Sequence, residues 1–114
     1  MNSEKFNLEW NEFESHASLA IKDLFSRNEF TDVTLVSEDN KQFSAHKVVL
    51  SGSSPFFQRI LLSNPHQHPL IYLKGIKHGD LKSILSFIYL GQTEVCQDDL
   101  DVFMDTAKEL EVKG

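Results

Sequence analysis

Residues 30–45 read Phe30-Thr31-Asp32-Val33-Thr34-Leu35-Val36-Ser37-Glu38-Asp39-Asn40-Lys41-Gln42-Phe43-Ser44-Ala45, and this stretch decides the fold. Apolar and polar residues alternate imperfectly over residues 31–37, as in a half-buried strand. Glu38-Asp39-Asn40 is typical of a turn, and Gln42-Phe43-Ser44-Ala45 has the character of a returning strand. The pattern therefore predicts a β-hairpin over residues 32–45.

Two short helices are predicted directly after the hairpin. The first covers residues 46–51. The second has Ser54 as its N-cap and Pro55 at its first helical position, and Asn64-Pro65 ends it. A short buried strand over residues 70–73 follows.

A central helix is predicted in the C-terminal half, from about Asp80 to Gly91, because apolar residues nearly encircle it. Gly91 is suited to the left-handed C-terminal cap. Residues 93–95 could form a minimal strand. Asp98 and Asp99 open a last helix, where acidic side chains favour the helix dipole. Its predicted buried stripe consists of Leu100, Phe103, Ala107 and Leu110.

The N-terminal segment Phe6-Asn7-Leu8-Glu9-Trp10 alternates between apolar and polar residues, which predicts a strand. No hairpin turn lies near it. Its partner strand is therefore remote in the sequence or belongs to another chain.

An amphipathic helix is predicted next, over residues 11–26. Leu19 and Ile21 widen its apolar zone beyond one stripe, so two interpretations stay open. Either the helix lies on its own core, or one face turns inward and another contacts a partner. The stripe at helical spacing consists of Phe13, Ala17, Ala20, Ile21, Leu24 and Phe25.

Composition indicates one soluble globular domain. The chain has 114 residues, of which 40% are hydrophobic and 25% are charged. No stretch approaches the roughly 20 apolar residues of a transmembrane helix. The net charge is −6, and residues 94–114 hold seven acidic and two basic residues. An acidic surface repels phosphate, so direct nucleic-acid binding is not expected. The single Cys96 favours a reducing compartment.

Little in the sequence points to catalysis or metal binding. His66 and His68 form the only close histidine pair, but no cysteine lies nearby and zinc sites usually have four well-spaced ligands. Cys96 lacks a nucleophile motif around it. No phosphate-binding glycine loop is present. We therefore expect no enzymatic activity, no cofactor and no metal site.

One charged pair stands out, namely Asp32 at the start of the hairpin and Lys47 at the start of the helix after it. The simpler interpretation is a pair of solvated charges at the rim of the domain. The alternative is a partly buried pair at an assembly surface, where removal of one partner leaves the other charge uncompensated.

Several segments together resemble the BTB/POZ domain family, and they span nearly the whole chain. In chain order they are Phe30-Thr31-Asp32-Val33-Thr34-Leu35, Phe43-Ser44-Ala45-His46-Lys47-Val48-Val49-Leu50-Ser51, Ser54-Pro55-Phe56-Phe57 and Leu81-Lys82-Ser83-Ile84-Leu85-Ser86-Phe87-Ile88-Tyr89-Leu90-Gly91. Phe6-x-Leu8-x-Trp10-Asn11 and the loop Asn64-Pro65-His66-Gln67-His68-Pro69 are further similar to the arthropod tramtrack group of this family. His66 stands where the loop of that group usually has cysteine.

The resemblance implies an α/β (α+β) fold, in which a small mixed sheet flanks a helix-rich cluster. One domain over residues 1–114 is expected, with a core over 13–112. The resemblance also implies a homodimer whose first helix packs on its twofold mate. An exchanged strand, residues 6–10, would pair with residues 93–95 of the other chain. The implied dimer interface consists of Phe6, Leu8, Trp10, Phe13, Ala17, Ala20, Ile21, Leu24, Phe25, Thr93 and Val95, and the charged pocket of the family corresponds to Asp32 and Lys47.

The function implied by the resemblance is that of a protein–protein interaction module in a nuclear transcription or chromatin regulator. The expected partners are the chain itself, as a dimer or higher multimer, and related BTB domains. Corepressor or chromatin proteins are further candidates, whereas nucleic acid and membrane are not. The alternative is a substrate adaptor for a cullin-type ubiquitin ligase. Such adaptors carry a hydrophobic-x-Glu motif where this chain has Leu62-Ser63-Asn64-Pro65.

Overall fold

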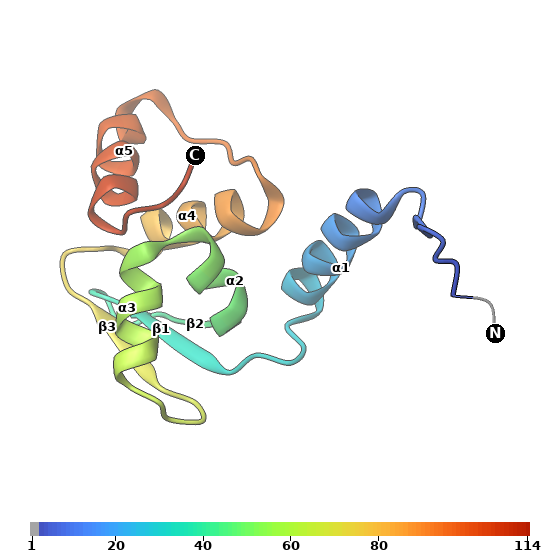
Figure 1. Cartoon of the computed structure of the whole chain (residues 1–114). Helices are drawn as coiled ribbons and strands as arrows, with labels where there is room; N and C mark the ends of the chain where they lie inside the picture. The colour runs from blue at the N-terminus through green and yellow to red at the C-terminus, as the bar shows by residue number, and fades with distance from the viewer. Residues whose placement is uncertain (1–2) are drawn as a thin grey trace.

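The computed structural model describes residues 3–114 (Figure 1). This part of the chain forms five α-helices, one 3₁₀ turn and three strands. In chain order these are α1 (Phe13–Arg27), β1 (Val33–Ser37), β2 (Gln42–Ala45), α2 (Lys47–Ser53), α3 (Pro55–Ser63), β3 (Leu70–Leu73), α4 (His78–Leu90), the 3₁₀ turn Gln97–Asp99 and α5 (Leu100–Glu109).

The three strands form one mixed sheet with the order β2-β1-β3. β1 and β2 pair antiparallel with Val33 opposite Ala45, so the predicted hairpin is confirmed. β3 pairs parallel to β1 with Leu35 opposite Ile71, and α2 and α3 make the crossover between the two strands. The expected α+β fold with a small mixed sheet is confirmed.

A single apolar core lies between the sheet and the helices. β1 contributes Val33 and Leu35, both with no exposed surface. Helix α4 is central, as predicted, because it buries side chains on several sides. From α4 the core includes Leu81, Ile84, Leu85 and Tyr89. Its remaining members are Ala45, Leu50, Phe57, Leu61, Leu73, Ile76, Phe103 and Leu110.

The predicted helix boundaries are confirmed where a side chain or a glycine caps the helix. The Ser54 Oγ accepts the N–H of Phe57 at 3.1 Å and donates to the carbonyl of Leu110, which ties the C-terminal end to the start of α3. Gly91 adopts a left-handed conformation with φ 77° at the end of α4, and its N–H bonds to Phe87. Both positions therefore act as the sequence predicts.

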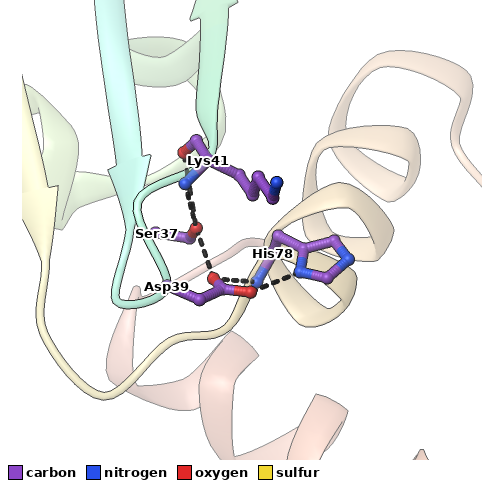
Figure 2. A network of polar contacts seen from close by, with 4 residues as sticks. All are labelled: Ser37, Asp39, Lys41 and His78. Carbon is purple, nitrogen blue, oxygen red and sulfur yellow. Dashed lines mark hydrogen bonds and ion pairs between the residues drawn. The ribbon is translucent and has the colours of Figure 1, made fainter.

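Helix α4 begins at His78, two residues before the predicted start, because the hairpin turn caps it. Asp39 lies in that turn, and its Oδ1 accepts the N–H of His78 at 3.0 Å. Its Oδ2 contacts the Nδ1 of the same histidine, and the buried Ser37 donates to Oδ1 at 2.6 Å (Figure 2). Ser37 also accepts the N–H of Lys41, so one network joins β1, the turn and α4.

This network gives a pH-dependent contribution to stability. The hydrogen bond from Ser37, followed by that from His78, holds the pKa of the Asp39 carboxyl well below its usual range. A lowered folded-state pKa stabilises the protein above the unfolded pKa, and the benefit is lost as the pH falls through the folded pKa. We expect Asp39→Asn to lower the urea midpoint at pH 7. The difference from the wild type should shrink steadily below about pH 4. A difference that stays constant from pH 7 to pH 2.5 would contradict this role.

Helix α1 and the segment before it project away from the rest of the fold (Figure 1). The radius of gyration is 17.2 Å, whereas a compact chain of this length is expected to have about 13 Å. No helix among residues 3–114 is long and apolar enough to cross a lipid bilayer.

Two predicted strands do not form within this single chain. Residues 6–10 are exposed and have no regular structure, and residues 93–95 form a loop between α4 and the 3₁₀ turn. A strand requires a hydrogen-bonding partner, and the sheet of the described chain includes neither segment. Of the two possibilities left open for residues 6–10, a remote partner strand within the same chain is not present in the described residues, while their pairing with residues 93–95 of another chain stays a prediction.

Candidate interaction surface

Helix α1 buries almost nothing against its own domain. None of its residues is classed as buried, and only Ala17, Leu24 and Phe25 are half-buried. Ala20 is exposed, and so are the large side chains Phe13 (56% exposed), Leu19 (60%) and Ile21 (37%). Of the two interpretations left open by the sequence, burial of the whole stripe against its own core is therefore wrong.

The segment before α1 is equally uncovered. Phe6, Leu8 and Trp10 are exposed by 78%, 90% and 61%. The Trp10 ring lies edge-on to Phe13 with ring centroids 5.4 Å apart and is tilted against His16 at 5.0 Å. These aromatic contacts continue the apolar surface of α1 toward the N-terminus.

The total surface area supports the same conclusion. The chain exposes 8440 Å², whereas a compact monomer of 13.0 kDa is expected to expose about 6,300 Å². The excess of roughly 2,100 Å² falls within the range that each partner buries in an obligate homodimer, about 1,000–2,500 Å². The exposed apolar side chains of α1 and of the segment before it contribute to this excess, and clustered exposed apolar side chains are typical of an interaction surface.

Three aromatic rings fix the C-terminal end of α1 to the domain. The ring of Phe25 stacks on Tyr89 of α4 with centroids 4.5 Å apart. The Tyr89 hydroxyl accepts the backbone N–H of His46 at 2.9 Å and lies 2.8 Å from its Nδ1. The other ring nitrogen of His46 contacts the carbonyl of Glu29, just after α1. Burial raises the pKa of Tyr89 to about 12, so the phenol keeps its proton at neutral pH.

The connection from α1 to β1 is sharply bent. Asn28 (φ 57°) and Phe30 (φ 59°) both adopt the left-handed conformation, which asparagine tolerates at the end of a helix but which costs energy for a bulky residue such as phenylalanine. Between them, the carbonyl of Glu29 is held by His46. The direction in which α1 leaves the domain is thus set by the backbone at these three residues.

Thr93 and Val95, the other predicted interface residues, are half-buried beside a cavity of about 410 Å³ at the end of α4. Its remaining lining residues are Phe87, Gly91, Gln92, Leu100 and Phe103. The structure does not bring this loop next to the N-terminal segment, which lies on the far side of α1 (Figure 1). Any contact between residues 6–10 and 93–95 would therefore have to form between two chains.

Asp32 and Lys47 lie close together, but each side chain bonds to a backbone group rather than to the other side chain. The Asp32 Oδ1 accepts the backbone N–H of Lys47 at 2.7 Å, at the N-terminus of α2. The Lys47 ammonium instead donates to the carbonyl of His66. No ion pair joins the two side chains in the described chain. Both are half-buried, and Asp32 stabilises the start of α2 as an anion at the positive end of its dipole.

The histidines are placed for structural roles. The His68 Nε2 lies 2.9 Å from the hydroxyl of Thr34, and His46 and His78 hold the two networks described above. Among residues 3–114, no group of three or more His, Cys, Asp or Glu side chains is placed to hold a metal ion.

Sequence reasoning missed the contact of His46 with Tyr89 and the capping of α4 by Asp39. The partners are 43 and 39 residues apart in the sequence, so no local pattern marks them. The residues His46 and Tyr89 do stand within the segments that carry the family resemblance, but spacing alone assigns them no partner.

Comparison with known proteins identifies a family and several relatives that match this chain. A family model of the BTB/POZ domain matches residues 21–114. Three relatives from Drosophila melanogaster match almost the whole chain: Longitudinals lacking protein-like (41% identical over 113 residues), Protein tramtrack, alpha isoform (40% over 114) and Protein abrupt (38% over 113). These matches include 99–100% of the residues of the chain. It spans 88% of the first relative, but only 14% and 12% of the other two.

Proposed function

The chain belongs to the BTB/POZ domain family, a family of protein-interaction modules, and we propose that it acts by self-association through helix α1. The observation that carries the proposal is the absence of any buried residue in α1. A helix of 15 residues with an apolar stripe is stabilised mainly by packing of that stripe. The packing partner that fits is α1 of a second copy across a twofold axis.

Exchange of the N-terminal segment would complete the dimer. Phe6, Leu8 and Trp10 present apolar side chains on alternate residues, which suits one face of a strand. In the proposed dimer this segment pairs with residues 93–95 of the mate. The apolar cavity lined by Phe87 and Leu100 then receives side chains from it.

The wider role we propose is the assembly of a nuclear transcription or chromatin regulator, by homodimers, higher multimers and mixed pairs with related BTB domains. The support is the similarity to the tramtrack group, in which the relative named tramtrack is 40% identical. In this proposal the domain has no catalytic activity. The cullin-adaptor alternative is not favoured, since the chain has Leu62-Ser63-Asn64-Pro65 in place of the adaptor motif.

Light scattering coupled to size exclusion tests the proposal over a concentration series. We expect a mass that is twice 13.0 kDa, or a larger even multiple, and that persists on dilution. Removal of residues 1–11 is expected to lower the mass of the larger assemblies, because these are built from dimers that the exchanged strand completes.

A monomer at every concentration would contradict self-association altogether. An unchanged mass distribution after the deletion would contradict only the exchanged strand and leave the α1 interface standing.

A further inference from the structure

Strand β3 forms an open edge of the sheet, since β1 lies on one side of it and no strand of the described chain on the other. Edge strands are commonly protected by charged residues or proline within the strand. β3 consists of Leu70-Ile71-Tyr72-Leu73 and contains neither. Pro69 and Lys74 flank it, so the four apolar residues between them are unprotected.

The direction of the backbone groups follows from the pairing with β1. The N–H of Thr34 bonds to the carbonyl of Pro69 at 3.0 Å, and Thr34 stands opposite Leu70. In a parallel pair, successive residues turn their N–H and C=O groups alternately toward and away from the neighbouring strand. Ile71 therefore faces β1, while Leu70 and Tyr72 direct both of their backbone groups to the open edge.

The side chains at this edge are exposed on one face of the sheet. Leu70 is 61% exposed and Tyr72 is 51% exposed, and the alternation of side chains places them on the same face. Ile71 and Leu73 turn the other way, half-buried and buried respectively. A groove of about 440 Å³ runs along the strand beside α3, and Ile60, Leu61 and Pro69 contribute to its lining.

We propose that this edge pairs with β3 of a second copy of the chain, antiparallel about a twofold axis at Ile71, and so joins dimers into larger assemblies. This register places Leu70 opposite Tyr72 of the second copy, and the reverse. Each of these pairs exchanges two hydrogen bonds, which satisfies all four outward backbone groups of each strand. The Leu–Tyr contacts are aliphatic–aromatic cross-strand pairs, which stabilise a sheet.

The charge distribution favours a second copy as the occupant. The chain carries −6 overall, and seven of its acidic residues lie in residues 94–114. Helix α5, which holds part of this acidic segment, lies at the top of Figure 1, while the loop leading into β3 lies at the bottom. The residues that line the groove include no acidic side chain. Two copies can therefore meet at β3 with neutral surfaces in contact and their acidic segments apart.

The proposed pairing of β3 strands depends on the proposed function in one respect, because it requires the dimer built through α1. Four hydrogen bonds and two side-chain pairs make a small interface, below the area expected of a stable dimer on its own. A dimer built through α1 carries two such edges, so the second contact gains from multivalency. The expected product is a particle whose mass is a multiple of the dimer mass.

A substitution at Tyr72 separates this interface from the α1 interface. Tyr72→Lys places a charge at the centre of the edge, and we expect it to reduce the multimer to a dimer of 26 kDa, which is twice 13.0 kDa. Tyr72→Pro should do the same, because its N–H faces outward and the bonds to β1 are kept. Met104→Lys is the matched control, with 48% exposure on α5 and the same charge change relative to a neutral side chain.

Disulfide trapping then tests the register. In a Cys96→Ser background the chain has no other cysteine. Ile71→Cys stands opposite its own copy at a Cα separation of about 4.5 Å, which a disulfide can bridge. We expect oxidation to cross-link this variant, whereas Gln42→Cys on the opposite edge strand should stay uncrosslinked.

The outcomes distinguish a failure of the β3 contact from a failure of the proposed function. Multimers that persist in Tyr72→Lys, or absence of the Ile71→Cys cross-link, would overturn the β3 contact and leave the dimer standing. A wild type that remains a dimer at every concentration would also overturn it and would leave the edge to an extended segment of a different protein. A wild-type monomer would overturn the proposed function, and the β3 contact with it.

Discussion

Ile21→Glu is expected to convert the assembled protein into monomers and to raise the dissociation constant of the dimer at least 100-fold. Ile21 lies on the apolar face of α1 and is 37% exposed in the single chain. In the proposed dimer the new carboxylate would be buried without a partner, which costs about 3–5 kcal/mol. A difference of about 1.4 kcal/mol corresponds to a tenfold change in affinity.

The variant should keep its monomer fold, because α1 contributes no buried residue to the core. Val102→Glu is the matched control, since Val102 is 49% exposed on α5, outside the proposed α1 interface. Sedimentation equilibrium across a concentration series gives the dissociation constants of both variants. A dimer of unchanged affinity in Ile21→Glu would place the α1 face outside the interface.

Tyr89→Phe is expected to lower the free energy of unfolding by about 1–3 kcal/mol, although it removes a single oxygen atom. Tyr89 is 4% exposed, and its hydroxyl bonds to the backbone N–H of His46 and contacts the Nδ1 of the same residue. Without the hydroxyl, both buried groups of His46 lose a hydrogen-bond partner. Removal of one partner from a buried polar pair costs the desolvation of the other.

The second tyrosine of the chain provides the control for this measurement. Tyr72 is 51% exposed on β3, so Tyr72→Phe should change the stability by no more than about 0.5 kcal/mol. Urea unfolding followed by circular dichroism compares the two variants at one protein concentration. Equal midpoints for both would show that the hydroxyl of Tyr89 does not support the fold.

Features that depend on neighbouring residues could be predicted from the sequence. The hairpin of β1 and β2, the cap at Ser54 and the left-handed Gly91 each depend on residues only a few positions apart. The alternation of residues 6–10 was also visible, and so was its lack of a local partner. What the pattern could not supply is the strand against which such a segment pairs, because the partner is not encoded nearby.

Features that join distant parts of the chain could not be predicted from the sequence. The parallel pairing of β3 with β1 depends on a crossover through α2 and α3, and periodicity does not fix that register. Asp39 was visible as a turn residue, but its capping of His78 exists only after α4 packs beside the hairpin. Asp32 and Lys47 were correctly placed together, but the sequence could not show that Asp32 accepts the backbone N–H of Lys47 while the Lys47 ammonium donates to the carbonyl of His66.

The bent connection after α1 affects how readily two chains associate. Asn28 and Phe30 adopt left-handed conformations, and the ring of His46 contacts the carbonyl of Glu29 between them. The orientation of α1 is therefore fixed before a partner binds. Association then gives up little conformational entropy at this joint, and most of the ordering is left to the residues before α1. The energetic cost of the left-handed Phe30 is met during folding, so α1 is already oriented at each later encounter with a mate.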